Sequence, residues 1–291
     1  MSNRGLFLLL ALGVIWGIPY LLIKVAVTEL SPAMLVLART GVAALVLVPL
    51  AASRRELRPV LRRWRPLLAF TVIEIIVPWY MLNSAEQHLP SSTTGLLIAA
   101  VPLVGFAYSY LIGSAERFLP GNWLGIGLGM AGVATIVGLD LDVTNTTAML
   151  QLAVVIVCYA VGPQIVSRSM SDVSGIAISA LAFAGAAIFY APIVLATGSL
   201  PAALPSGPVL AAVLVLGVVC SALAFIVFLA LIGEVGPVRT TVVTYINPAV
   251  AVVAGALVLG ESVTVWTVVG FALVIAGSYL VTRRGRTKLL A

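Results

Sequence analysis

Two ionisable side chains lie deep inside apolar stretches of the sequence, where such groups are rare. Glu74 lies about nine residues into the stretch 66–85, and Arg39 about eight residues into the stretch 32–52. A charged group inside a membrane is costly, usually faces protein or water, and often carries protons or binds a ligand. Because a helix rises about 1.5 Å per residue and the stretches run in opposite directions, both groups can reach a similar depth. Glu74 is therefore interpreted as a proton carrier or a contact for an ammonium group, or as the partner of Arg39 in a fixed ion pair.

Aromatic and amide side chains occur inside the same kind of apolar stretch. A small amphipathic ligand needs an apolar cavity with a few polar groups, so these residues are candidates for a cavity lining. Trp and Tyr also form belts at membrane interfaces, and polar groups can simply bridge helices, so we expect about half of them to line a cavity. The candidates are Trp16, Tyr20, Trp79, Tyr80, Asn83, Tyr108, Tyr110, Tyr159, Gln164, Tyr245 and Asn247.

The composition indicates which elements hold these groups. The mean hydropathy is +1.18, and 9% of the residues are charged, whereas about 25% are charged in a soluble globular domain. The sequence therefore excludes a soluble globular fold and predicts an all-α membrane protein. Apolar runs of about 20 residues, long enough to cross the hydrocarbon as helices, are found at 4–25, 32–52, 66–85, 91–113, 122–139, 147–167, 173–197, 208–232, 237–259 and 263–282.

The basic residues predict how these ten spans are oriented. Of the 16 Lys and Arg residues, all except Lys24 and Arg39 fall on the side of the membrane that holds both termini. Short cytoplasmic loops collect positive charge, so both termini are predicted to be cytoplasmic. The basic loops are too short to form a nucleic-acid-binding module.

Enzymatic chemistry finds no support in the sequence. His88 is the only histidine and lies beside Glu86 in a predicted outer loop, where neither a metal cluster nor a Ser-His arrangement can be assembled. Cys158 and Cys220 lie in apolar runs, where a free cysteine acts as a small hydrophobic residue. We expect no enzyme activity, no cofactor and no metal.

Prolines interrupt several of the predicted spans. A proline removes a helix hydrogen bond and bends or opens the backbone, although a kink that only improves packing is the alternative. Pro90 and the hydroxyl residues from Ser91 onward predict a capped helix start, where a carboxylate can also bind. The candidate hinges are Pro19, Pro102, Pro163 and Pro248.

Two stretches of the chain repeat each other. AERFLPGNWLGIGLGMAGVATI from Ala115 and GESVTVWTVVGFALVIAGSYLV from Gly260 share an acid and two glycines at the same spacing. The chain is therefore predicted to hold two units, 1–143 and 144–291. If each unit has an odd number of spans, the units are inverted, and a substrate site lies between them. The glycine faces are expected to pack inside one chain rather than between chains.

The order of these motifs resembles a known family. IWGIPYLLIKVA from Ile15, SPAMLVLAR from Ser31 and the doubled stretch are similar to the drug/metabolite transporter superfamily, in its ten-span EamA branch. Within that branch the chain looks most like the bacterial YddG-type amino-acid exporters. The resemblance implies two inverted five-helix repeats, alternating access and a central cavity. The cavity residues that it implies are Trp16, Tyr20, Glu74, Tyr80, Asn83, Leu97, Tyr159, Gln164, Tyr245 and Asn247.

The expected function is export of aromatic and other neutral amino acids, or related small metabolites, across the bacterial cytoplasmic (inner) membrane. Ala182 and Val219 replace Arg39 and Glu74 in the second unit, which disfavours symmetrical proton coupling and favours facilitated diffusion. A proton-coupled exporter of drugs or lipophilic cations is one alternative, with Glu74 as the cation's partner. The other alternative is a membrane receptor or scaffold that binds a ligand without transporting it. The expected partners are a small-molecule substrate and the lipid bilayer, without nucleic acid, and a monomer is compatible with the sequence.

Overall fold

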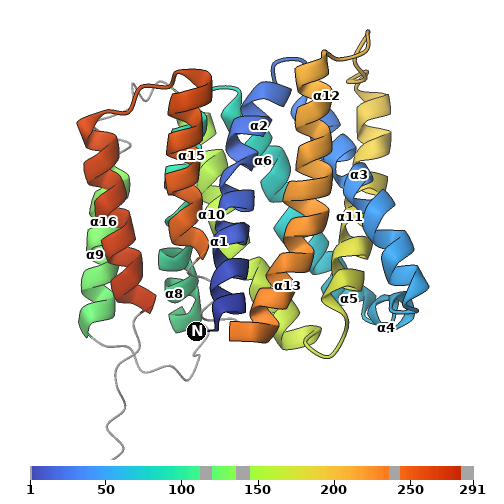
Figure 1. The fold of residues 1–291 in the computed structure, drawn as a ribbon, viewed down its shortest axis with the longest axis horizontal. Helices are drawn as coiled ribbons and strands as arrows, with labels where there is room; N and C mark the ends of the chain where they lie inside the picture. Colours follow the sequence, from blue (N-terminus) through green and yellow to red (C-terminus); the bar gives the residue numbers. More distant parts are fainter. Residues whose placement is uncertain (1, 112–119, 136–144, 236–242, 283–291) are drawn as a thin grey trace, which may run out of the picture.

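The chain folds into helices that stand side by side (Figure 1). The computed structural model describes residues 2–111, 120–135, 145–235 and 243–282, and this part of the chain contains no strand. Two elements, η1 and η3, are π-helices, and the others are α-helices. In chain order they are α1 Asn3–Gly17, α2 Pro19–Ala26, α3 Pro32–Ser53, α4 Leu57–Leu61, α5 Trp64–Phe70, η1 Thr71–Ile76, α6 Val77–Glu86, α7 Ser91–Ile98, α8 Val101–Leu111, α9 Pro120–Thr135, α10 Thr146–Ser169, α11 Gly175–Ala196, α12 Gly207–Leu214, η3 Val215–Leu223, α13 Ala224–Val235, α15 Val243–Leu259 and α16 Val265–Thr282.

Several helical segments are long and apolar enough to cross a membrane. Six qualify by length and composition: Asn3–Ala26, Pro32–Ser53, Trp64–Glu86, Thr146–Ser169, Gly175–Ala196 and Gly207–Phe228. Three shorter apolar helices are Ser91–Gly105, Ile246–Leu259 and Val265–Gly277. Large apolar side chains such as Leu45, Ile188 and Leu257 point outward, where lipid can cover them. The protein is therefore an all-helical, multi-pass membrane protein, and the number of ten spans remains a prediction.

Two of the predicted spans are broken near prolines. The chain passes from α1 to α2 at Ile18, directly before Pro19, and α8 begins one residue before Pro102. A proline has no N–H to donate to the preceding turn, so a break costs little there. By contrast, α10 and α15 continue past Pro163 and Pro248. The four hinge assignments remain predictions, and only the first two coincide with a break.

The two π-helices occur at matching places in the two halves. Glu74 lies in η1, and Val219, its counterpart by sequence, lies in η3. Pro78 follows η1 and has no N–H, so it cannot bond to the carbonyl one turn earlier. No proline occurs in η3. Single π-helical turns often occur at functional sites.

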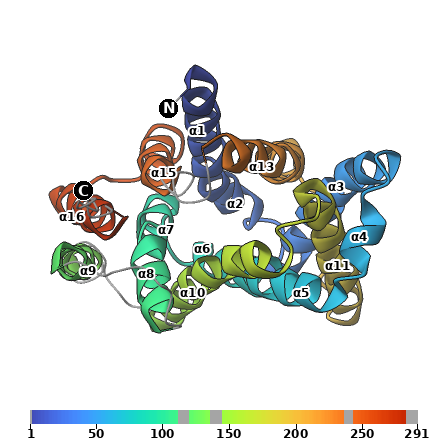
Figure 2. The ribbon, with the colours of Figure 1, turned by 90° about the horizontal axis from the view of Figure 1, so that it is seen from below.

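The glycine-rich helices α9 and α16 pack on each other (Figure 2). A Cβ atom added at Gly132 would lie 2.6 Å from the carbonyl oxygen of Gly270, and one at Gly277 would lie 2.5 Å from that of Gly125. Small residues let two helices approach this closely. The two glycine faces therefore meet within one chain, as expected. At the opposite end of the molecule, α3 packs on α11 (Figure 2).

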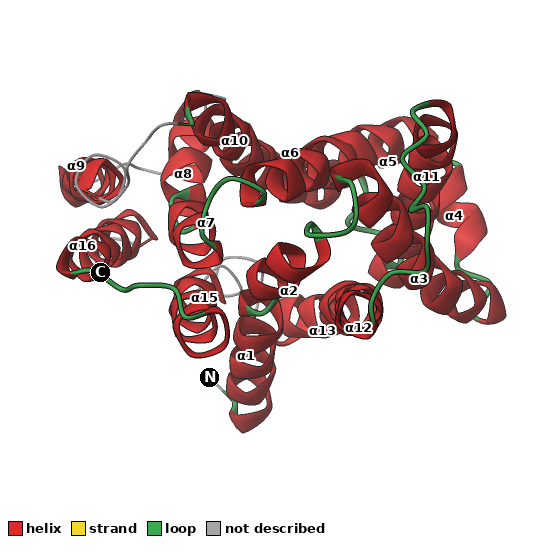
Figure 3. Ribbon diagram, turned by 90° about the horizontal axis from the view of Figure 1, so that it is seen from above, coloured by secondary structure: helices red, strands yellow, loops and turns green. Residues whose placement is uncertain are grey.

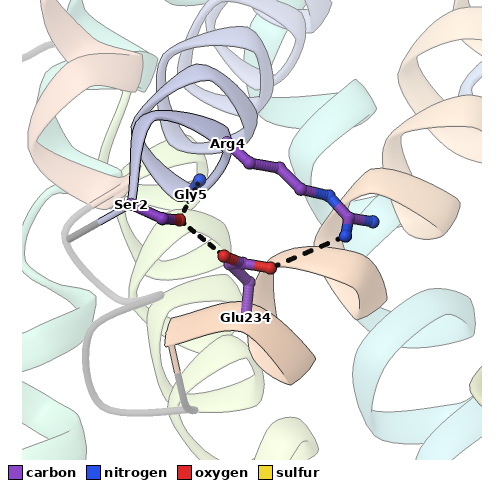
Figure 4. Close-up of polar contacts among 4 residues, drawn as sticks. All are labelled: Ser2, Arg4, Gly5 and Glu234. Atoms are coloured by element: carbon purple, nitrogen blue, oxygen red, sulfur yellow. Dashed lines mark hydrogen bonds and ion pairs between the residues drawn. The ribbon is translucent and has the colours of Figure 1, made fainter.

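Polar contacts join the two halves of the chain at the end that carries the N-terminus (Figure 4). Ser2 Oγ donates a hydrogen bond of 2.5 Å to Glu234 Oε1, and Arg4 Nη1 lies 3.8 Å from Glu234 Oε2. Arg63 Nη1 donates to the carbonyl oxygen of Ser169. These contacts link α1 to α13 and the start of α5 to the end of α10, on the side that we expect to face the cytoplasm.

Candidate functional site

Glu74 is held inside the molecule by η1 and rests on the backbone of α10. Its Oε2 is buried and has no hydrogen-bond partner among the described residues. A Cβ atom at Gly162 of α10 would overlap Oε2 and would lie 2.9 Å from Cδ. Because Gly162 has no Cβ, it leaves the space that the carboxylate occupies, and a larger residue would have to displace Glu74.

Arg39 is a buried charge, and its contacts are with groups other than Glu74. Only 4% of Arg39 is exposed, its Nε donates to Ser221 Oγ at 3.2 Å, and its Cζ lies 3.6 Å from the centre of the Trp79 ring. Arg39 and Glu74 form no ion pair in the part of the chain that the structure describes. The possible ion pair is not formed in this structure, in which a hydroxyl of η3 and an aromatic face of α6 contact the guanidinium instead.

Ser221 completes this arrangement from the second half of the chain. Its hydroxyl accepts from Arg39 Nε and donates to the carbonyl oxygen of Leu216 at 2.7 Å, so it is fixed in one orientation. Trp79 is fixed by Phe183, with the ring centres 5.6 Å apart. The guanidinium is therefore positioned by Ser221 of η3 and by the ring of Trp79 of α6.

Tyr159 of α10 is close to both ionisable groups. It interacts electrostatically with Glu74, Arg39 and Tyr20, and it packs against both large apolar clusters of the core. Groups from α2, α3, η1, α10 and η3 therefore surround one interior region. This region holds a carboxylate and a guanidinium that are not bonded to each other.

Trp16, Tyr20 and Leu97 contribute apolar packing near this region. Trp16 packs on Phe228, with the ring centres 5.0 Å apart. Tyr20 and Leu97 are buried in the same apolar cluster. Their predicted cavity roles remain predictions.

The amide candidates make contacts that tie helices together. The amide nitrogen of Asn247, oriented by its hydrogen-bonding partners, donates to the carbonyl oxygens of Gly13 and Val243 at 3.0 Å each. Asn83 Nδ2 donates to the carbonyl oxygen of Pro32 at 3.3 Å. Asn247 therefore joins α15 to α1, and Asn83 joins α6 to the start of α3.

The remaining candidates for the cavity lining are Tyr80, Gln164 and Tyr245. Tyr80 is 39% exposed and stacks on Tyr190 of α11, with the ring centres 6.3 Å apart. Gln164 is half-buried near the end of α10. The side chain of Tyr245 lies outside the described residues.

Three residues that matter here were missing from the sequence-based site. Ser221 was hidden in an apolar run, although it stands two residues from Val219, the counterpart of Glu74. Gly162 precedes Pro163, and a glycine and a proline together inside a span indicate an unusual backbone. Glu86, expected in a loop, is the last residue of α6 and has no exposed surface.

The acid of the second repeated stretch binds the start of α7. Glu261 Oε1 accepts from the backbone N–H of Ser91 at 2.8 Å, and Oε2 accepts from that of Ser92 at 2.9 Å. Partial burial raises the pKa of Glu261, but the hydrogen bonds from Ser92 and Ser91 outweigh it and leave the pKa below its ordinary value. The predicted helix start therefore exists, and a carboxylate from the other half of the chain satisfies its free amides.

The sequence is similar to a known family of transporters and to several of its relatives. The model of the EamA-like transporter family matches residues 3–138 and 146–283. The uncharacterized inner membrane transporter YedA of Escherichia coli (strain K12) is 30% identical over 283 residues, which cover 94% of this chain and 90% of that protein. The probable terminal-alkyne amino-acid exporter of Streptantibioticus cattleyicolor is 26% identical over 286 residues, covering 97% and 94%.

A solved structure agrees with the fold. A crystal structure described only as that of a protein superposes with a TM-score of 0.72 and covers 97% of this chain and 98% of its own. At 20% identity this likeness concerns the fold alone. The two family matches span nearly the whole sequence, and this chain belongs to the EamA-like transporter family of the drug/metabolite transporter superfamily.

Proposed function

We propose that this transporter exports aromatic and other neutral amino acids by alternating access, as facilitated diffusion. The observation that carries the proposal is a pair of oppositely ionisable groups in the interior, the buried Arg39 and the half-buried Glu74, which are not bonded to each other. A free amino acid brings one carboxylate and one ammonium group, which these two side chains can neutralise. The printed name of the Streptantibioticus relative, an amino-acid exporter, supports the same class of substrate.

Arg39 is suited to the carboxylate end of the substrate. Its Nε is used by Ser221, and no described residue hydrogen-bonds to its two terminal nitrogens. A guanidinium binds a carboxylate through two parallel N–H groups, and stacking on Trp79 holds its plane still. The fixed orientation lowers the entropic cost of binding.

Glu74 is suited to the ammonium end. Its Oε2 has no donor within the described residues, so an ammonium group would supply the hydrogen bond that the protein does not. The second half offers Val219 and Ala182 at the matching places, and these residues cannot exchange protons. This asymmetry supports facilitated diffusion over symmetrical proton coupling.

The proposed architecture is ten spans in two inverted repeats, 1–143 and 144–291. The two family matches, one in each half, support two units. The matching positions of η1 and η3 support a common plan for them. The concentration of Lys and Arg on the side of the membrane that holds both termini supports cytoplasmic termini. In this arrangement the Arg39–Glu74 region lies between the repeats, as in other inverted-repeat transporters.

The test is uptake of labelled aromatic, aliphatic and hydroxyl amino acids into proteoliposomes without an ion gradient. We expect saturable uptake that unlabelled amino acids inhibit. Amino-acid amides lack the carboxylate, and N-acetyl amino acids lack the ammonium group, so neither should compete. Arg58→Gln, which removes an exposed charge, is the matched control for Arg39→Gln. Competition by both analogues as strong as that by the free amino acid would overturn the proposed site for a zwitterion.

Two alternatives predict other outcomes of the same assay. A lipophilic-cation exporter would be inhibited by aromatic cations and not by amino acids. Arg39 argues against it, because the guanidinium covers the Trp79 face that a cation would use and repels positive charge. A receptor or scaffold would bind an amino acid saturably and show no flux.

A further inference from the structure

Glu86, unlike Glu74, is an acid that is completely buried and whose carboxylate oxygens are both unpartnered among the described residues. It ends α6 at the end of the molecule opposite the N-terminus, where α2, α6 and α7 pack together (Figure 3). Its side chain has no exposed surface, and neither carboxylate oxygen has a hydrogen-bond partner in the described part of the chain. Glu74 is half-buried and has one buried oxygen without a partner among the described residues, whereas Glu86 is fully enclosed and has two. A carboxylate enclosed in this way is so unfavourable that the group binds a proton instead.

Lys24 is close to Glu86 but does not neutralise its side chain. Lys24 Nζ donates to the backbone carbonyl oxygens of Glu86 at 2.7 Å and of Leu89 at 2.9 Å. The ion pairs found among the described residues do not include Lys24 and the Glu86 carboxylate. The lysine therefore closes the end of α6, and the carboxylate must be neutralised by another means.

Asn83 provides an acceptor that a protonated Glu86 can use. Residues three apart on a helix are neighbours on one face, and Asn83 lies one turn before Glu86 on α6. Asn83 is fully buried, its Nδ2 donates to the carbonyl oxygen of Pro32, and its Oδ1 has no donor among the described residues. A protonated carboxyl group has one O–H to donate. One proton on Glu86 would therefore remove the buried charge and give Asn83 Oδ1 a donor.

The other charged and titratable groups around Glu86 are few. Tyr20 and Lys24 of α2 and Glu261 of the α15–α16 connection interact with it electrostatically, and His88, two residues on, is exposed. Glu261 borders a cavity of about 230 Å³, lined also by Pro90 and Thr264 among others. Glu261 is held ionised at the start of α7, whereas Glu86 is enclosed. The two acids therefore have environments that favour opposite protonation states.

We propose that Glu86 is a proton-binding site that locks this end of the transporter closed. The proton binds when α2, α6 and α7 close over Glu86, and it leaves to the same side when they separate. The proposal rests on the alternating access proposed above. Because the closed conformation binds one more proton than the open one, acid on this side favours closure and slows transport. No proton crosses the membrane, so the site regulates facilitated diffusion without driving it.

The direct test is infrared spectroscopy of the purified protein at neutral pH. We expect a carbonyl stretch from a protonated carboxyl group that is absent in Glu86→Gln and present in Glu29→Gln, which alters an exposed acid at the same end. Asn83→Ala should shift this band to higher frequency, because the carboxyl group loses its acceptor. A wild-type spectrum without a band that depends on Glu86 would overturn the proposal. If Glu86→Gln does not fold, the Asn83→Ala shift tests it alone, and an unshifted band would be the contrary result.

The flux test compares uptake between about pH 8 and about pH 5, a range in which an enclosed carboxyl group can change its proton. Wild-type and Glu29→Gln uptake should fall as the pH is lowered, by at most about tenfold per pH unit for one proton. Glu86→Gln, permanently neutral, should be slow and independent of pH. A wild-type pH profile in Glu86→Gln would overturn the lock. Absence of amino-acid uptake at every pH would count against the proposed function only, since the infrared result does not depend on the substrate.

Discussion

The two π-helical segments have a common backbone distortion and different chemistry. In the first half, η1 carries Glu74 against the backbone of Gly162. In the second half, η3 carries Val219 at the matching place and presents Ser221 to Arg39 of the first half. Both segments therefore project a polar group into the interior, but only one of those groups is ionisable. The repeated fold fixes where polar groups can stand, and the local sequence decides which of them bear charge.

This difference assigns distinct tasks to the halves. The first half supplies both charges, and the second supplies the hydroxyl that orients one of them. Glu261 is another group of the second half that stabilises the first half, because its carboxylate binds the start of α7. Each half is thus incomplete alone.

The largest expected effect comes from removing the charge that the halves hold jointly. Arg39→Gln should reduce uptake at low substrate concentration roughly 30- to 160-fold, because about 2 to 3 kcal/mol of charge-assisted hydrogen bonding is lost. Uptake by Arg39→Lys should lie between that of the wild type and that of Arg39→Gln, since lysine keeps the charge and lacks the planar guanidinium group. Initial rates in proteoliposomes measure this. Full activity in Arg39→Gln would show that the charge has no part in transport.

The next effect comes from closing the space beside Glu74. Gly162→Ala should reduce uptake about tenfold, because the new methyl group overlaps the carboxylate and must displace it. Adding Glu74→Asp, which shortens the acid, should restore part of the activity. Gly105→Ala is the matched control, since its nearest neighbour, Ala160 Cβ, lies 3.9 Å from the added atom. If both alanine variants behave alike, the contact with Glu74 is not important.

A smaller effect should follow from removing the hydroxyl of η3. Ser221→Ala should raise KM about fivefold and leave the maximal rate nearly unchanged, because a hydrogen bond is worth about 1 kcal/mol net. The double variant with Arg39→Gln should be no worse than Arg39→Gln alone, since the two residues act through one contact. Additive losses would contradict this.

The smallest expected effect comes from Glu261, an acid of the second half that binds the start of α7 in the first half. Glu261→Gln should lower the stability of the detergent-solubilised protein by about 1 kcal/mol, the scale of a helix N-cap. The pKa of Glu261 is lowered, so its stabilisation is present above its ordinary pKa and is lost as the pH falls through the lowered value. The Tm difference from wild type should be constant near neutral pH and vanish below about pH 4. A difference that grows in acid would contradict the assignment.

The sequence predicted the membrane class and the glycine packing well. Hydropathy determines the class, because helices are among the few backbone structures that can span a lipid bilayer. The glycine spacing determines the packing, because small residues allow close contact between helices. The prolines were less informative, since α10 and α15 continue through Pro163 and Pro248 while α1 ends before Pro19. Proline changes the hydrogen bonds of one turn, and neighbouring helices decide whether the helix bends or breaks.

The sequence alone indicated that Arg39 and Glu74 lie within membrane helices, because both stand inside long apolar runs. Only the tertiary structure decided their partners. Ser221 lies 182 residues from Arg39 in the chain, and Gly162 lies in a different helix from Glu74. Burial of a charge follows from local composition, whereas its compensation depends on which distant groups the fold brings within hydrogen-bonding distance.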